Sequence, residues 1–297
     1  MGTRDIIKKL QDYTHLAWDE KAVTSGTGGT FLKSRTKSSR GNIYYKLSYY
    51  DRYRGIYGHE SINELIASRL LDNLGIPHIP YRLVHALVMV NGRAHETWLS
   101  ESRDYRRPHE RRQALDTYID LNARGDESPL DFCARRGWTD AINAMMAFDY
   151  LIINRDRHGA NIEVILRDGT VELAPLFDHG VSFAFSCYDD EERIRAFDPM
   201  ADRNANNYIG SRSLERNLEL IPSGALQGSV LSSGSATLFR GLEDAMPDCL
   251  REKIWEIIST RWQHLVDLGI AKDGRILCHT GQCAQKGHAV CVHALYR

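Results

Sequence analysis

The sequence predicts an α+β protein of two lobes, a small β-rich first lobe with one helix and a mainly helical second lobe. Strand-like and turn-like segments alternate over residues 1–101, whereas helical patterns dominate residues 102–297. The chain has 297 residues, of which 42% are hydrophobic, so it holds enough apolar material for one or two cores. We place the boundary between the lobes after residue 101.

The composition excludes several classes of protein. With 38 Lys+Arg against 39 Asp+Glu the net charge is -1, which gives no sign of a nucleic-acid partner. No apolar stretch is long enough to cross a bilayer, and the N-terminus lacks the apolar segment of a secretion signal. The six cysteines are too unevenly placed for a disulfide framework. We therefore expect a cytoplasmic protein with neither a membrane nor a direct nucleic-acid partner.

The first lobe opens on a glycine-rich loop at residues 24–30, which we expect to be flanked by a strand on each side. Its glycines, Gly26, Gly28 and Gly29, permit close approach of the backbone to a ligand. Residues 42–47 are β-branched and aromatic, which predicts a strand that carries Lys46.

A single helix and a hairpin complete the first lobe. Apolar residues recur at helical spacing between 57 and 74, and Gly75 followed by Pro77 predicts the end of this helix. Residues 81–90 and 93–99 are two extended runs joined by Asn91-Gly92, the dipeptide that favours a type I′ hairpin.

The second lobe is predicted to be helical with one short β insertion. Two strand-like runs, 162–166 and 171–174, are joined by a turn at 167–170. Helical patterns occupy the following segments: 110–123, 129–136, 139–153, 212–220, 235–245 and 247–268.

Polar motifs lie on both sides of this insertion. Asp156, His158 and Asn161 follow a helix directly, and Asp178 lies beyond the hairpin. A carboxylate, an amide five residues later and a second carboxylate are what magnesium-dependent phosphoryl transfer requires. Each residue alone would also suit an ordinary turn, so the joint pattern carries the prediction.

The first lobe supplies the complementary half of a nucleotide site. After the glycine-rich loop come Lys46 on a strand and Glu64 on the helix. A lysine in this place can reach nucleotide phosphates, and a helix carboxylate can hold it. Glu60 lies one turn before Glu64 on the same face, so the carboxylate assignment stays open between these two.

These motifs resemble those of the HipA-like serine/threonine kinases, bacterial toxin kinases whose fold is related to phosphatidylinositol kinases and protein kinases. The resemblance covers about residues 24 to 185. It depends on the Asp156-x-His158-x-x-Asn161 element, on the segment from Leu173 to Asp178 with Ser182, and on Asn63-Glu64 with Ala67, Leu70, Gly75 and Ile76.

The resemblance implies roles for individual residues. Asp156 would be the catalytic residue, with His158 in the same element, and Asn161 and Asp178 would bind Mg²⁺. The cofactors would be ATP and Mg²⁺. Lys46 would contact the ATP phosphates, held by Glu64, while Gly26, Gly28 and Gly29 would cover them and Glu101 would belong to the adenine-binding hinge.

The chain departs from the family in two respects. It starts almost at the glycine-rich loop, as compact members do that lack an extra N-terminal subdomain. Ala160 stands where a basic residue commonly precedes the metal-binding Asn, so we expect Arg155 or Arg157 to supply that charge.

Phosphorylation of the glycine-rich loop is a regulatory device of this family, which makes Ser25, Thr27 and Thr30 candidate autophosphorylation sites. A phosphate there adds nearly two negative charges where the phosphates of ATP must lie. The alternative is that these hydroxyl groups simply donate hydrogen bonds to ATP.

The expected function is that of an ATP- and Mg²⁺-dependent serine/threonine protein kinase of the toxin type, autophosphorylating and growth-inhibiting. The resemblance implies a protein substrate, possible involvement of translation, and a helix-turn-helix antitoxin as partner. A small-molecule or lipid kinase on the same scaffold and a nucleotide-binding pseudokinase are the alternatives.

The C-terminal segment is rich in potential zinc ligands but lacks their regular spacing. Cys278, Cys283 and Cys291 alternate with three histidines in a pattern that matches no paired zinc-binding motif. We expect an irregular tail.

Overall fold

The computed structural model describes residues 5–18, 30–39, 41–107, 109–228, 230–231 and 234–273. The predicted loop residues Gly26, Gly28, Gly29, Ser25 and Thr27 lie outside these ranges, as does the side chain of Thr30. The cysteine- and histidine-containing C-terminal segment also lies outside them.

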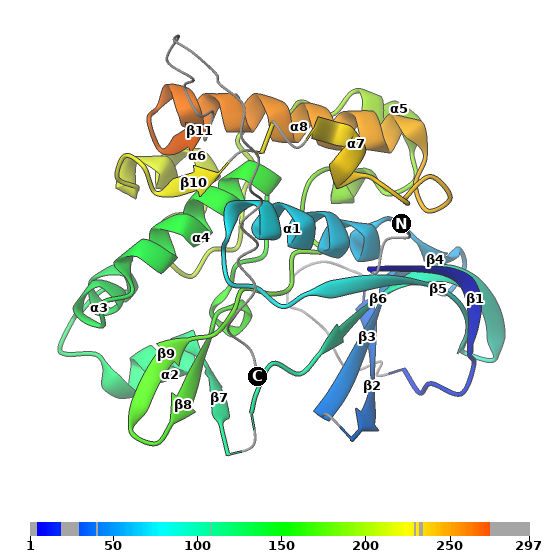
Figure 1. Cartoon of the computed structure of the whole chain (residues 1–297), viewed down its shortest axis with the longest axis horizontal. Coiled ribbons are helices and arrows are strands. Elements are labelled where there is room, and N and C mark those ends of the chain that lie inside the picture. Colours follow the sequence, from blue (N-terminus) through cyan, green and yellow to red (C-terminus); the bar gives the residue numbers. More distant parts are fainter. Residues whose placement is uncertain are drawn as a thin grey trace, which may run out of the picture.

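The first part of the chain forms a six-stranded sheet (Figure 1). Its strands follow the order β1-β5-β6-β3-β2, with β4 paired to β3. Strand β1 runs parallel to β5, and the other pairs are antiparallel. The strands are β1 (Ile6–Tyr13), β2 (Thr30–Ser38), β3 (Gly41–Asp51), β4 (Gly55–Tyr57), β5 (Tyr81–Val90) and β6 (Arg93–Arg103).

Two local predictions in this part are confirmed. The β5–β6 hairpin turns at Asn91 and Gly92, whose φ angles of 49° and 75° are the two positive values of a type I′ turn. Helix α1 (Glu60–Leu74) ends at Gly75, which adopts the left-handed conformation with φ 65°. The N–H of Ile76 then donates to the carbonyl of Leu71, a typical helix-ending arrangement.

Helix α1 lies between the sheet and the helical part of the chain (Figure 1). On one side it contacts β3, β5 and β6, and on the other α7 (Gly234–Leu238) and β10 (Leu226–Gly228). Leu65, Ile66 and Leu70 are buried in the larger of two apolar cores. The smaller core includes Leu47, Val84, Val88 and Leu99 of the sheet. Because α1 is buried from Glu60 to Ser68, its polar residues in this stretch are held in fixed positions.

The remainder is helical with two small sheets. The pairs β7–β8 and β8–β9 form a three-stranded antiparallel sheet, and β10 pairs with β11. The helices and strands not yet named are β7 (Arg111–Ala114), α2 (Leu115–Asn122), α3 (Pro129–Arg135), α4 (Thr139–Ile152), η1 (Gly159–Asn161), β8 (Glu163–Arg167), β9 (Thr170–Leu173), η2 (Phe185–Cys187), α5 (Glu191–Arg195), α6 (Leu214–Asn217), η3 (Leu218–Leu220), α8 (Asp248–Asp267) and β11 (Ala271–Asp273).

Two helix predictions were too long. Residues 111–114 form strand β7 instead of the first turn of a helix, because their backbone pairs with β8; the buried helical pattern begins only at Leu115. The helix predicted over 235–245 ends at Leu238, and Gly241 follows with a φ of 85° that an α-helix cannot contain. Within the described ranges, no helix is long and apolar enough to span a bilayer.

Candidate active site

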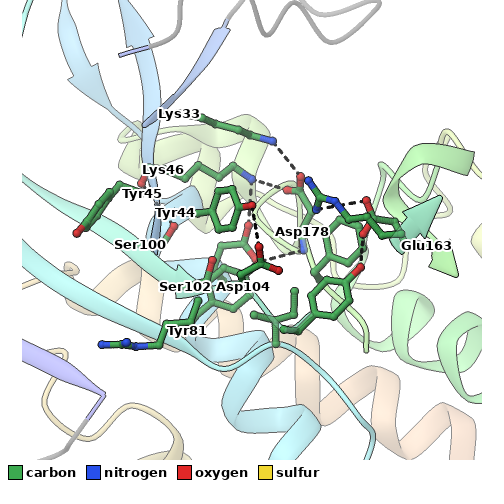
Figure 2. A pocket seen from close by; sticks show the side chains of 16 residues that line it. Lys33, Tyr44, Tyr45, Lys46, Tyr81, Ser100, Ser102, Asp104, Glu163 and Asp178 are labelled. Carbon is green, nitrogen blue, oxygen red and sulfur yellow. Dashed lines mark hydrogen bonds and ion pairs between the residues drawn. The ribbon is translucent and has the colours of Figure 1, made fainter. Parts of the chain in front are cut away.

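Lys46 on β3 is the centre of a buried ion-pair network. Its Nζ lies 3.0 Å from Glu64 Oε1. It also contacts Asp178 Oδ1, and Figure 2 shows Lys46 pointing toward Asp178. The side chain of Lys46 is 11% exposed, and that of Glu64 is fully buried. Burial alone would lower the pKa of Lys46, but the carboxylates of Asp178 and Glu64 outweigh it and raise that pKa. Lys46 therefore carries a positive charge into the site.

The structure resolves the choice between Glu60 and Glu64. Oε2 of Glu60 accepts a hydrogen bond from the backbone N–H of Tyr49 at 3.1 Å, whereas Glu64 pairs with Lys46. Burial raises the pKa of Glu60 to about 7. Glu64 is thus the carboxylate that holds Lys46, and Glu60 joins α1 to β3.

Asp178 is held from several directions. Its backbone has a left-handed φ of 58°, and its N–H donates to Tyr81 Oη at 3.1 Å. Lys33 Nζ lies 3.3 Å from Asp178 Oδ2, so both carboxylate oxygens face a lysine. Burial would raise the pKa of Asp178, but Lys33 and Lys46 outweigh burial and hold it well below its usual value. The carboxylate is therefore ionised.

Lys33 and Tyr81 were not predicted as site residues. Lys33 lies on β2 directly after the glycine-rich loop, which is the single sequence signal that could have pointed to it. Tyr81 begins the strand β5 that follows α1 and gave no signal of a role at Asp178.

The segment after Asp178 is tied to α1. The N–H of His179 donates to Glu64 Oε2 at 2.7 Å, and Asn63 Nδ2 donates to the carbonyls of Gly180 and Ser182 at 2.9 and 3.0 Å. A Cβ at Gly180 would lie 3.2 Å from Lys46 Nζ, so only glycine allows this approach without displacement. The Asn63-Glu64 pair therefore positions the segment that carries Asp178.

The second motif follows α4 through a strained residue. Ile153 has a φ of 54°, which is a rare conformation for a β-branched residue. The N–H of Phe183 donates to the Ile152 carbonyl at 2.7 Å, and the N–H of Arg155 donates to the Val181 carbonyl at 3.1 Å. These bonds bring the Asp156 loop alongside the segment that follows Asp178.

Arg157 links the two motifs. Its guanidinium is buried and bonds both oxygens of Asp149 at 2.9 Å. Its Nη1 donates to the carbonyls of Asn161 and Phe177, each at 3.0 Å, so these two carbonyl oxygens lie within twice that distance of each other. Because it is committed to these partners, Arg157 does not face the pocket, contrary to the expectation that it could supply charge there.

Replacement of Arg157 by leucine should destabilise the protein by about 3–5 kcal/mol, because it leaves the buried Asp149 carboxylate unpaired. The matched control is Arg195→Leu, which removes a pair with Glu191 whose two side chains are 63% and 60% exposed; it should cost less than about 1 kcal/mol. Urea unfolding monitored by circular dichroism measures both changes. Equal changes would contradict a structural role for the buried pair.

Asp156 lies beside Asn161 and is partly exposed. The carboxylate is 24% exposed, and burial raises its pKa. Asn161 Nδ2 donates to the backbone carbonyl of Asp156 at 2.8 Å, which leaves the amide oxygen of Asn161 as the atom that a cation would bind. His158 Nε2 lies 3.8 Å from Asp156, and its Nδ1 accepts the N–H of Ala160 at 3.2 Å, so His158 shapes the loop. Asn206 Nδ2 lies 3.4 Å from Asp156 Oδ1 and was not predicted.

A cavity of about 230 Å³ opens onto this network (Figure 2). Lys33, Lys46, Glu64 and Asp178 line one end. The other lining residues are Tyr44, Tyr45, Ile79, Tyr81, Ser100, Ser102, Arg103, Asp104, Tyr105, Arg112, Glu163 and Phe177. Charged side chains thus line the cavity beyond the ion-pair network as well, together with aromatic and polar ones.

The side chain of Glu101 does not line this cavity. Strand alternation places Ser100 and Ser102 on the cavity side, and Glu101 Oε1 lies 3.5 Å from Arg82 Nε on the other face. Residues 102–105 line the cavity at the place where an adenine-binding hinge was predicted.

The donor set at Asp178 and Asn161 fits Mg²⁺ better than a soft metal. Within the described part of the chain, no three His, Cys, Asp or Glu side chains gather to hold a metal ion. One carboxylate and one amide oxygen suit Mg²⁺, which keeps several waters and takes further ligands from substrate phosphates. These two residues would hold such an ion only together with a nucleotide.

Comparison with known proteins agrees with this geometry at the level of the fold. No family model matches the chain, and no curated protein matches it. Among solved structures, the proinflammatory kinase CtkA of Helicobacter pylori is similar with a TM-score of 0.54 at 13% identity, covering 88% of this chain and 97% of CtkA. The fold is kinase-like. The prediction of a sheet-rich part followed by helices in a kinase-related arrangement is therefore confirmed.

A second solved structure is HipA of Shewanella oneidensis MR-1, determined with HipB and operator DNA. Its TM-score is 0.42 at 18% identity, and the match covers 85% of this chain and 59% of HipA. The chain therefore matches about three fifths of the length of that toxin.

Proposed function

We propose that this chain is an ATP- and Mg²⁺-dependent serine/threonine protein kinase of the HipA-like toxin type. The observation that carries the proposal is the joining of two half-sites. Lys46, Glu64 and Asp178 form one ion-pair network, and Arg157 fixes the Asp178 segment against the loop of Asp156 and Asn161. Phosphoryl transfer depends mainly on positioned charges, and this arrangement supplies them.

In the proposed arrangement ATP lies between two lobes divided near residue 101. Lys46 Nζ, kept protonated by Glu64 and Asp178, binds phosphate oxygens, and Lys33 adds a second positive charge beside Asp178. Asp178 and Asn161 hold Mg²⁺, which neutralises charge between the phosphates when bound. The glycines of the loop at residues 24–30 cover the phosphates.

Asp156 is the proposed catalytic residue. It orients the acceptor hydroxyl and accepts its proton as the phosphoryl group is transferred. Its partial exposure leaves an approach for a large acceptor, and burial raises its pKa, which strengthens it as a base. The acceptor is a protein, and the chain itself is included through Ser25, Thr27 or Thr30.

The proposal includes a toxin role in the cytoplasm. HipA of S. oneidensis is a toxin solved with its HipB partner, and a helix-turn-helix antitoxin is the corresponding proposed partner here. Growth arrest on expression, relieved by such a partner, is the expected cellular result.

Incubation with ATP labelled at the γ-phosphate tests the activity. The chain is incubated alone, with a cell lysate and with a lipid extract, each with and without Mg²⁺. Mg²⁺-dependent label on serine or threonine of proteins supports the proposal. Label that enters only lipid or metabolites, or no transfer despite ATP binding, would refute it in favour of another kinase class or a pseudokinase.

Glu64→Gln should lower kcat/KM for ATP by about tenfold or more, because the amide no longer fixes the Lys46 charge. Glu60→Gln is the matched control, one turn away on the same helix, and should change kcat/KM by less than about threefold because Glu60 only accepts a backbone N–H. Steady-state kinetics at varied ATP concentration measures both. A larger loss in the Glu60 variant would show that Glu60, and not Glu64, holds Lys46 during the reaction.

A further inference from the structure

A segment that comes much later in the chain, residues 203–208, lies beside the proposed catalytic residue Asp156. The N–H of Asn206 donates to the Arg155 carbonyl at 2.8 Å, and the N–H of Tyr208 donates to the Arg157 carbonyl at 2.9 Å. This two-residue spacing is that of adjacent extended segments. The pairing brings Asn206 Nδ2 to 3.4 Å from Asp156 Oδ1. Residues 203–208 therefore border the side from which an acceptor reaches Asp156.

Two arginines are fixed along this border. Arg155 Nε donates to the carbonyl of Asn204 at 3.1 Å, and the Arg155 guanidinium lies 5.3 Å from the centre of the Phe185 ring. Arg203, the residue next to Asn204, lies with its guanidinium 4.0 Å from the centre of the Phe197 ring. Both side chains are partly buried. Aromatic contacts of this kind hold an arginine in place and leave its planar face or edge free to bind.

Neither arginine has a carboxylate partner within the described part of the chain. Arg203 Nη2 contacts the Asp198 carbonyl at 3.4 Å, while its buried Nε has no hydrogen-bond partner among the described residues. The nearby carboxylates are used elsewhere: Asp198 accepts the N–H of Met200 at 2.9 Å, and Asp202 accepts from Ser213 and from the N–H of Glu215.

The two positive charges also act on each other. Burial, followed by the charge of Arg203, lowers the pKa of Arg155. Two guanidinium groups that repel each other beside a reaction centre are stabilised by an anion between them. Carboxylate and phosphate groups are the anions whose geometry matches an arginine fork. In the proposed function Asp156 acts on the acceptor hydroxyl, so an anion at these arginines comes from the acceptor itself.

We propose that Arg155 and Arg203 form an anion-binding subsite for the protein acceptor, so that the preferred serine or threonine has a carboxylate or phosphate group nearby. This inference depends on the proposed kinase function. Arg155 directly precedes Asp156 in the chain, and an extended peptide advances about 3.3 Å per residue. We therefore place the anionic residue of the acceptor protein within about three positions of its acceptor hydroxyl.

A peptide series tests the subsite. Serine peptides carry aspartate, phosphoserine, alanine or lysine at each of the three positions on either side of the acceptor. For wild type, kcat/KM should be about tenfold higher with aspartate or phosphoserine than with alanine at one or more positions, chiefly through KM. A higher value for phosphoserine than for aspartate identifies phosphate as the preferred anion, and the reverse identifies a carboxylate.

Variants assign the preference to the arginines. Arg203→Gln should reduce the acidic preference to less than about threefold, and Arg203→Glu should favour the lysine peptides. Arg216→Gln is the matched control, because it removes the charge of an exposed arginine on α6 outside this border; it should keep the wild-type preference. Circular dichroism verifies folding, and Arg155→Gln replaces Arg203→Gln in the comparison if the latter is unfolded.

Two results would overturn the subsite: equal kcat/KM for aspartate, phosphoserine and alanine peptides in wild type, or a preference that Arg203→Gln and Arg155→Gln leave unchanged. A binding arm separates this failure from failure of the kinase function. Fluorescence polarisation follows a labelled phosphoserine peptide on the chain without ATP. Binding that weakens about tenfold in Arg203→Gln supports the subsite even if no peptide is phosphorylated.

Discussion

Replacement of Asp156 by asparagine is expected to lower kcat for phosphoryl transfer by about 10²–10⁴-fold, the range that general acid–base catalysis contributes. The amide keeps the shape of the side chain and its contact with Asn206, but it can no longer accept a proton. The dissociation constant for ATP should change by less than about threefold, because the proposed nucleotide contacts come from Lys46, Asp178 and the cavity.

The matched control is Asp168→Asn, the same change of chemistry in the β8–β9 turn. Asp168 has a φ of 39°, a conformation that asparagine also tolerates. This variant should transfer phosphate at the wild-type rate. Single-turnover transfer measures the rate, and calorimetric titration measures ATP binding. An Asp156→Asn variant that retains more than about a tenth of wild-type turnover would remove Asp156 from the chemistry.

Replacement of Lys46 by methionine is expected to lower kcat/KM for ATP by about 10²–10³-fold. Methionine fills similar space but removes the positive charge that is proposed to bind the ATP phosphates. The loss also leaves Glu64 buried without its partner. Burial and the charge of Asp178 then raise the pKa of Glu64 against only the N–H of His179, and Glu64 should take up a proton.

Lys37→Met is the control, because Lys37 is an exposed lysine on β2 outside the network. Its kcat/KM should equal that of wild type. Lys46→Arg serves as a second variant that keeps the buried charge and should fold even if Lys46→Met does not. Full activity in a folded Lys46→Met protein would contradict the assignment of Lys46 to the phosphates.

The parts that the sequence predicted well depend on local chemistry. The end of α1 follows from the left-handed conformation that Gly75 adopts easily, and the β5–β6 turn follows from Asn91 and Gly92. A strand lysine held by a helix carboxylate was predicted from the order of Lys46 and α1, with Glu60 and Glu64 both left open. The structure places Glu64 in contact with Lys46.

The parts that the sequence did not predict depend on long-range packing or strand register. The face on which Glu101 lies is set by the pairing of β6 with β5 and β3, which residue types alone do not reveal. The sequence leaves open whether Arg157 binds phosphate or has a structural role, because its pairing with the buried Asp149 depends on tertiary packing. Asn206 reaches Asp156 through backbone pairing between distant segments, and no motif marks it.

The central claim is that Asp178 and Asn161 form one metal and nucleotide site with Lys46. Calorimetric titration of ATP with and without Mg²⁺, on wild type, Asp178→Ala and Asn161→Ala, tests it most directly. We predict that Mg²⁺ raises the affinity of wild type for ATP and that Asp178→Ala, which removes a charged ligand, loses most of this gain; Asn161→Ala, which removes a neutral one, should lose less. Wild-type affinity for ATP that is independent of Mg²⁺ and unchanged by Asp178→Ala would contradict the claim.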